Sequence, residues 1–122
     1  MSNVAELKIN NGTIKGVCEN GMYVFKGIPF AKPPIGQLRF MPPVPVDNWV
    51  GTLDCTSYGP RPCQVPPPWC VDKDTAVYGE DCLNLNVWTP VADGRKRPVA
   101  VNIFGGGHME GSNSEIGSEG YH

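Results

Sequence analysis

The chain has 122 residues, 40% of them apolar, and a net charge of −2 at neutral pH, which fits one domain with enough apolar side chains for a core. The charge provides no basic surface for nucleic acid, and no apolar run approaches the roughly 20 residues of a membrane helix. Neither nucleic acid nor a membrane is therefore expected as a partner. The first residues lack the basic start and apolar centre of a signal peptide, and both cytoplasmic and secreted locations stay open.

The N-terminal 26 residues predict a small antiparallel meander. Asn-Gly pairs at Asn11-Gly12 and Asn20-Gly21 separate alternating runs. This pair is the strongest short hairpin signal, because a type I′ turn needs positive φ at both central positions. Three strands are expected, near residues 4–10, 13–18 and 22–26.

A proline-rich stretch follows at residues 27–51, and its six prolines exclude a helix or a central strand. We expect an extended segment that lies over a core. Four apolar side chains are predicted to anchor it by packing: Phe30, Leu38, Phe40 and Trp49. Residues 51–80 are expected to be irregular.

Regular structure is predicted again at residues 82–90, where apolar and polar residues alternate as in an outer strand. After a turn at Asp93-Gly94, residues 97–107 read RPVAVNIFGGG, and this continuous apolar run predicts a more deeply buried strand. The two are expected to pair as a hairpin, with the basic run 95–97 at its solvated tip. No stretch predicts an amphipathic helix, although a buried strand of this kind requires helices to cover it.

Three consecutive glycines, 105–107, end the second predicted strand. Without Cβ atoms they let a partner atom approach main-chain N–H groups, an arrangement that suits a permanent or transient anion. No GxxxxGK[ST] and no GxGxxG opening a helix accompanies them, which disfavours a nucleotide. An oxyanion hole and a loop that is glycine-rich only for close packing are the two remaining interpretations.

Four segments occur in the order GIPFAKPPIGQLRF, NWVGTLDCTSYGPRPCQ, GEDCLNLNVWTP and PVAVNIFGGGHMEGS. This order resembles the N-terminal part of the type-B carboxylesterase/cholinesterase family of α/β-hydrolases. The resemblance implies an α/β class, with residues 1–122 as the N-terminal portion of a single α/β-hydrolase domain: the meander, the proline-rich segment and the first strands of the central sheet. It also implies a serine carboxylesterase that hydrolyses small-molecule esters through an acyl-enzyme, without a metal or another cofactor.

The same resemblance implies roles for the residues around the glycine triplet. The backbone N–H groups of Gly106 and Gly107 would donate to the oxyanion, and Gly105 would shape the turn. The sequence departs from the family pattern, in which His or Tyr precedes the glycines and an aromatic residue follows them. Here Phe104 precedes and His108 follows. Both are expected to line the wall of the acyl pocket or gorge, and His108 is not expected to be the catalytic base.

Five cysteines leave at least one unpaired within the chain. One or two disulfides with buried thiols are favoured over a metal site, since no CxxC occurs. The resemblance implies a Cys63–Cys82 disulfide, which would contribute about 3 kcal/mol when oxidised, and a small buried thiol at Cys55. It also implies a buried, hydrogen-bonded ion pair between Arg39 and Glu80 in place of two exposed charges.

A serine hydrolase also needs a nucleophile, a base and an acid, yet no G-x-S-x-G motif occurs. Ser112, Ser114 and Ser118 lie in a polar loop and are expected to be solvated. Trp69 is expected at a lid or gorge rim, or packed. The catalytic triad is expected on a complementary, larger C-terminal chain. A catalytically inactive adhesion or interaction domain of the same family is the alternative, and a free-standing β domain that binds an anion is a third interpretation.

Overall fold

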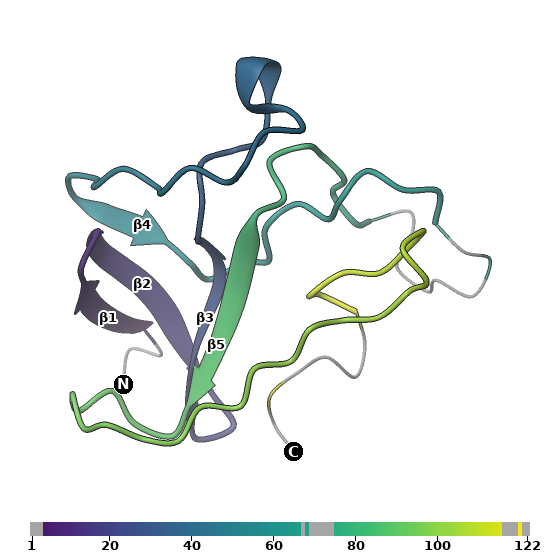
Figure 1. Cartoon of the computed structure of the whole chain (residues 1–122). Coiled ribbons are helices and arrows are strands. Elements are labelled where there is room, and N and C mark those ends of the chain that lie inside the picture. The colour runs from purple at the N-terminus through teal and green to yellow at the C-terminus, as the bar shows by residue number, and fades with distance from the viewer. Residues whose placement is uncertain (1–3, 67, 69–74, 116–119, 121–122) are drawn as a thin grey trace.

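The structure, a computed structural model, describes residues 4–66, 68, 75–115 and 120. Its five strands form one sheet in the order β1-β2-β3-β5, with β4 joined to β2 (Figure 1). Every strand pair is antiparallel except β2 with β4. The elements are β1 Val4–Ile9, β2 Gly12–Glu19, β3 Met22–Pro29, the 3-10 helix η1 Gly36–Leu38, β4 Thr52–Asp54 and β5 Asn84–Thr89. No helix among these described residues is long and apolar enough to cross a membrane.

The meander forms as predicted, but one of its two turns is displaced. Asn20 and Gly21 take φ values of 50° and 76°, as a type I′ turn requires. The first turn lies at residues 10–11, because Ile9 pairs with Gly12. Gly12 is therefore a strand residue, and a Cβ there would overlap the indole of Trp49. The Asn-Gly signal at this position reflects close packing and not the turn.

Trp49 fastens the proline-rich segment to the first hairpin, as predicted for this anchor. Its backbone N–H donates to the Asn11 carbonyl over 2.9 Å, and its indole Nε1 donates to the Thr13 carbonyl over 2.9 Å. It packs against a core formed by five buried residues: Ala5, Ile14, Phe25, Ile28 and Cys55. Cys55 is fully buried, as expected, and burial raises the pKa of its thiol.

The short strand β4 interrupts the region 51–80 that was expected to be irregular. β3 pairs with β2 only over residues 17–19 of β2, which leaves the rest of that edge free. β4 pairs in parallel with residues 13–15 of β2 and so occupies this edge. A strand of three residues has no periodicity that the sequence could reveal.

Two of the predicted anchors do not pack. Phe30 is 53% exposed and Phe40 is 92% exposed. Phe40 takes a left-handed backbone conformation, with φ of 60°, and the Arg39 guanidinium lies over its ring at 5.1 Å. The physical reason for Phe40 is that the chain around η1 stands clear of the sheet (Figure 1). Phe30 directly follows β3 and its backbone N–H donates to the Leu83 carbonyl over 3.1 Å, so there only the side chain is left exposed.

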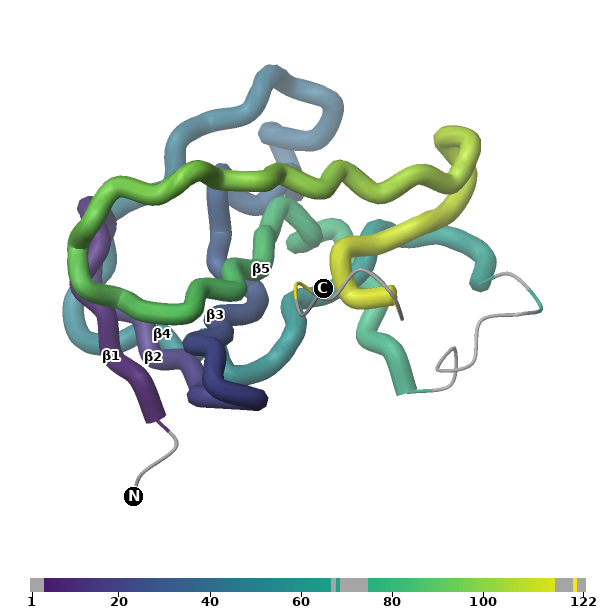
Figure 2. The backbone as a smooth tube through the Cα atoms, turned by 90° about the horizontal axis from the view of Figure 1, so that it is seen from below, coloured from purple at the N-terminus to yellow at the C-terminus, as the bar shows by residue number. Residues whose placement is uncertain are grey.

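The predicted hairpin between residues 82–90 and 97–107 is wrong. β5 pairs with β3 instead, and residues 97–105 contain no strand. We call residues 97–115 the arm; its first part runs as an extended chain past the sheet (Figures 1 and 2). Its apolar side chains are exposed, Val99 by 82%, Val101 by 79% and Ile103 by 85%. The described residues offer this run neither a strand to pair with nor an apolar layer to cover it, and a buried strand needs both.

Candidate functional site

The glycine triplet enters a closed turn, residues 104–111, which we call the glycine loop. The Gly106 carbonyl accepts hydrogen bonds from the backbone N–H groups of Met109 at 3.1 Å and Glu110 at 3.2 Å. Gly106 and Gly107 take φ values of 126° and 61°, where glycine is strongly preferred. The glycines thus produce the turn itself as well as giving access to the backbone.

Two glycines of this loop are required by contact within it. A Cβ on Gly106 would overlap the carbonyl oxygen of Glu110, and a Cβ on Gly111 would overlap the carbonyl oxygen of Gly105 and lie 2.8 Å from the Phe104 ring. The loop therefore folds back on itself, with Gly106 against the 110–111 peptide. Neither position can carry a side chain without opening the turn.

The backbone donors of the triplet are available to an external acceptor. A Cβ on Gly105 or Gly107 would meet nothing within 4 Å. Within the described part of the chain, the N–H groups of Gly106 and Gly107 donate to no acceptor. Gly107 is exposed and Gly106 is half-buried, so both donors can be reached from solvent, and two adjacent donors of this kind suit an anion.

Phe104 and His108 flank these donors in the same loop. Phe104 is 41% exposed, and His108 has a left-handed backbone with φ of 61°. A non-glycine residue there costs conformational energy, and such strain is common where loop geometry serves a site. The structure thus brings five of the residues singled out by the sequence into one turn, namely 104–108.

One residue that the sequence did not single out holds the end of the loop. The Gln64 Oε1 atom accepts from the Gly111 N–H over 2.7 Å, and its Nε2 donates to the Gly111 carbonyl over 2.9 Å. The carboxamide thus satisfies both main-chain groups of one residue, 47 positions away in sequence. A single glutamine in a proline-rich stretch gives no local signal of such a role.

The chain after the loop is attached to the sheet by polar side chains. Arg61, only 4% exposed, donates from Nε to the Ser114 hydroxyl over 2.8 Å. Asn113 donates to the Asn84 backbone carbonyl over 2.9 Å, and Asn86 donates to the Asn113 carbonyl over 2.9 Å. Because Asn84 and Asn86 belong to β5, the polar face of this strand positions the arm.

The two described serines of this region differ from expectation. Ser112 is 1% exposed, and its hydroxyl lies 3.3 Å from that of Ser114. The expectation that both are solvated is therefore wrong for Ser112. Its hydroxyl is part of the attachment that Arg61 and Asn113 complete. Ser118 and Trp69 lie outside the described residues.

The comparison with known proteins places the chain in a family. The model of the carboxylesterase family matches residues 3–121. The chain belongs to the carboxylesterase family. Among its relatives are phenmedipham hydrolase of Pseudarthrobacter oxydans, 45% identical over 83% of this chain and 21% of that protein, and para-nitrobenzyl esterase of Bacillus subtilis, 42% identical over 85% of this chain and 22% of that protein.

Solved carboxylesterase structures share its fold. A PNB esterase structure superposes with a TM-score of 0.84 at 40% identity, over 94% of this chain and 24% of its own. The Geobacillus stearothermophilus carboxylesterase EST55 gives 0.80 at 41% identity, over 95% and 22%. The fold is thus the N-terminal part of an α/β-hydrolase, and the chain spans about a fifth of the curated relatives it matches.

The disulfide implied by the family resemblance is not formed in this structure. Cys63 and Cys82 are both free thiols, Cys63 exposed and Cys82 half-buried. Burial raises the pKa of Cys82, and the neighbouring Cys63 adds to the rise. The pairing stays a prediction. Cys70 lies outside the described residues.

Arg39 and Glu80 lie together, with Arg39 Nε 2.7 Å from Glu80 Oε1. Their side chains are 58% and 44% exposed, so the expected burial is wrong. The reason is again the position of the segment around η1, which stands away from the sheet (Figure 1). An exposed pair of this kind contributes little to stability.

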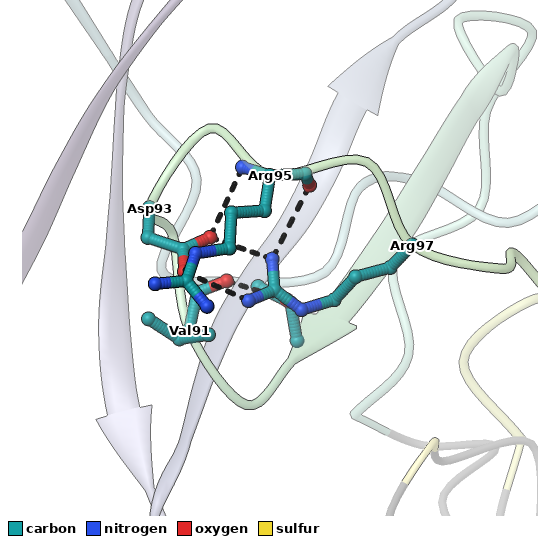
Figure 3. A network of polar contacts seen from close by, with 5 residues as sticks. Val91, Asp93, Arg95 and Arg97 are labelled. Carbon is teal, nitrogen blue, oxygen red and sulfur yellow. Dashed lines mark hydrogen bonds and ion pairs between the residues drawn. The ribbon is translucent and has the colours of Figure 1, made fainter.

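The basic run 95–97 forms an ion-pair network at the turn after β5 (Figure 3). Arg97 donates to both carboxylate oxygens of Asp93, over 2.7 and 2.9 Å, and Arg95 donates its backbone N–H to the same carboxylate over 3.1 Å. The Arg97 guanidinium holds the pKa of Asp93 at about 2. Both arginines of the run thus lie against one carboxylate, which balances one of the run's three positive charges. As for metals, the described residues contain no group of three or more His, Cys, Asp or Glu able to hold an ion.

Proposed function

We propose that this chain is the N-terminal portion of a serine carboxylesterase, with residues 1–122 as part of a single domain, and that it supplies two of the three oxyanion donors. The observation that carries the proposal is the pair of N–H groups on Gly106 and Gly107 that have no acceptor among the described residues. Membership of the carboxylesterase family supports it, as do the relatives named as esterases and hydrolases.

In the reaction, a serine hydroxyl attacks the carbonyl carbon of an ester and the carbonyl oxygen becomes negatively charged. The two N–H groups donate to this oxygen, and their alignment before the reaction lowers the barrier. Collapse of the intermediate releases the alcohol and leaves an acyl-enzyme, which water then hydrolyses to the acid. Phe104 and His108, at the two ends of the triplet, would form part of the wall against which the acyl group packs.

The nucleophile, base and acid would come from residues outside these 122, since no G-x-S-x-G motif occurs among them. We propose a complementary C-terminal chain of the same hydrolase as the partner. Val99, Val101 and Ile103 support this partner, because they expose apolar surface next to the glycine loop and such surface is normally covered. The small-molecule substrate would be an ester of a carboxylic acid.

A fluorophosphonate probe tests the proposal, because it phosphonylates the activated serine of an esterase. Native material containing this chain should hydrolyse p-nitrophenyl butyrate, and mass spectrometry should find the probe on a peptide outside the 122 residues. Labelling of Ser112 or Ser114 would contradict the assignment. Native material that neither hydrolyses the ester nor reacts with the probe would favour an inactive adhesion or interaction domain.

A further inference from the structure

The carboxamide of Gln64 contacts the glycine loop at its C-terminal end, Gly111. It receives the Gly111 N–H at 2.7 Å and donates to the Gly111 carbonyl at 2.9 Å. Gly111 is buried and has φ of 115°, a conformation that only glycine adopts without strain. Gln64 therefore fixes a residue whose own backbone preferences would leave it free to move.

The contact passes directly to one of the proposed oxyanion donors. The Gly111 N–H held by Gln64 belongs to the 110–111 peptide, and this peptide lies against Gly106 so closely that a Cβ there would overlap its oxygen. The Gly106 carbonyl in turn accepts from the Glu110 N–H. That carbonyl shares its peptide with the Gly107 N–H, and Gly111 itself lies against the carbonyl oxygen of Gly105, whose peptide includes the Gly106 N–H. A rotation of the 110–111 peptide would therefore displace the peptides of both donors.

Gln64 is itself held in place by its neighbours. Its Nε2 also donates to the Pro62 carbonyl over 3.1 Å. Arg61, which precedes Pro62, donates its backbone N–H to the Val77 carbonyl over 2.8 Å, and its own carbonyl accepts from the Gly79 N–H over 2.9 Å. Through these bonds residues 61–64, which lie 40 or more positions before the glycine loop in the sequence, form a fixed support for it.

We propose that Gln64 is a positioning residue of the oxyanion hole: it sets the orientation of the 110–111 peptide and, through it, that of the Gly106 N–H. This inference rests on the proposed function of the loop. Gln64 contacts neither substrate nor the reacting atoms, and it acts only through Gly111. Its amide presents a donor group and an acceptor group together and so matches the two main-chain groups of Gly111, which no charged side chain of similar size does.

The test uses the complete esterase and the variant Gln64→Met, which keeps the length of the side chain and removes its two hydrogen bonds to Gly111 together with the one to Pro62. Active sites are first counted by titration with a fluorophosphonate. We expect kcat per titrated site to fall by about tenfold, as the loss of two neutral hydrogen bonds implies, with KM changed less than about twofold. The affinity for a trifluoromethyl ketone, which forms the tetrahedral oxyanion on binding, should fall by the same factor.

A merely structural role would give a different result: fewer titratable sites, each with normal kcat and normal ketone affinity. That result would overturn the proposal. Gln37→Met, at an exposed position of η1, is the matched control and should leave all three quantities unchanged. Gln64→Glu keeps the acceptor for the Gly111 N–H but opposes the Gly111 carbonyl with a negative charge, and at neutral pH it should not restore kcat.

Amide hydrogen exchange separates this inference from the proposed function. If the wild-type protein hydrolyses no ester, the proposed function fails, and exchange still decides the role of Gln64. We expect the hydrogen-bonded amides of Met109, Glu110 and Gly111 to exchange at least about tenfold faster in Gln64→Met, because a side-chain hydrogen bond is lost and the loop opens more often. Unchanged exchange throughout the loop would refute a positioning role.

Discussion

In the sheet, ladder hydrogen bonds join β1, β2, β3 and β5 to one another, and a small apolar core packs beside them. The arm has neither a ladder nor a core, and its apolar side chains are exposed. It is held instead by side-chain amides, a guanidinium and a hydroxyl, from residues 27 to 53 positions away. The comparison shows that the candidate site depends on directional polar contacts, whereas the sheet depends on burial.

Removal of a core side chain should damage the sheet most. Phe25 is 1% exposed, and Phe25→Ala should lower the free energy of unfolding by about 3–5 kcal/mol, since it leaves a cavity in a close-packed region. Val50→Ala, at a fully exposed position, should change it by less than about 0.5 kcal/mol. Urea unfolding of the two variants gives the comparison, and equal midpoints would contradict this account of the core.

A substitution in the glycine loop should affect activity more than stability. Gly106→Ala places a Cβ on the Glu110 carbonyl, so the loop must open and one donor is displaced. We expect kcat to fall by about 100- to 1,000-fold, the usual effect of losing one oxyanion donor. Gly36→Ala is the control for a glycine with positive φ: Gly36 has φ of 55° and open space around it, so only the backbone conformation is strained there. Its activity should stay near that of the wild type, and a similar loss in both variants would exclude a specific role for Gly106.

The turn after β5 should show a pH dependence of known sign. The pKa of Asp93 is lowered from 3.8 to about 2, first by the Arg97 hydrogen bond. Its contribution to stability is therefore complete above pH 3.8 and is lost as the pH falls toward 2. Titration of the Asp93 carboxyl carbon by NMR should give a value near 2, and Arg97→Gln should raise it. A wild-type pKa near 3.8 would show that the network in Figure 3 does not persist in solution.

The smallest effect is expected for Arg39 and Glu80. Their ion pair is exposed on both sides, so a double-mutant cycle with Arg39→Ala and Glu80→Ala should give a coupling below about 1 kcal/mol. The cycle is measured by urea unfolding. A coupling of about 3 kcal/mol or more would be typical of a buried pair and would show that the solution environment of this segment differs from the one described.

The sequence was sufficient for elements with a strong local pattern. The three strands of the meander and β5 follow from period-two alternation, and the Asn20-Gly21 turn follows from its required φ values. β4 was missed because three residues carry no period. The turn at residues 10–11 was misplaced because Gly12 is needed for contact with Trp49, a long-range requirement that looks like a turn signal.

The candidate site was only partly predictable for the same reason. The glycine triplet indicates backbone access wherever it occurs, and residues 104–108 do form one loop. The support of the loop could not be read from the sequence, because Gln64, Arg61 and Asn86 become neighbours of the arm only after folding. The run 97–103 was misassigned because an apolar sequence indicates that a segment tends to be buried, but it does not indicate which strand or layer the segment would pack against.

The most direct test of the oxyanion assignment is a crystal structure of the complete protein that contains this chain, after reaction with a phosphonate ester. The negatively charged phosphonyl oxygen takes the place of the oxyanion. The account predicts that this oxygen lies about 2.7–3.1 Å from the backbone nitrogens of both Gly106 and Gly107. A phosphonyl oxygen that points away from the glycine loop, with water or another group bound to those two N–H groups, would contradict it.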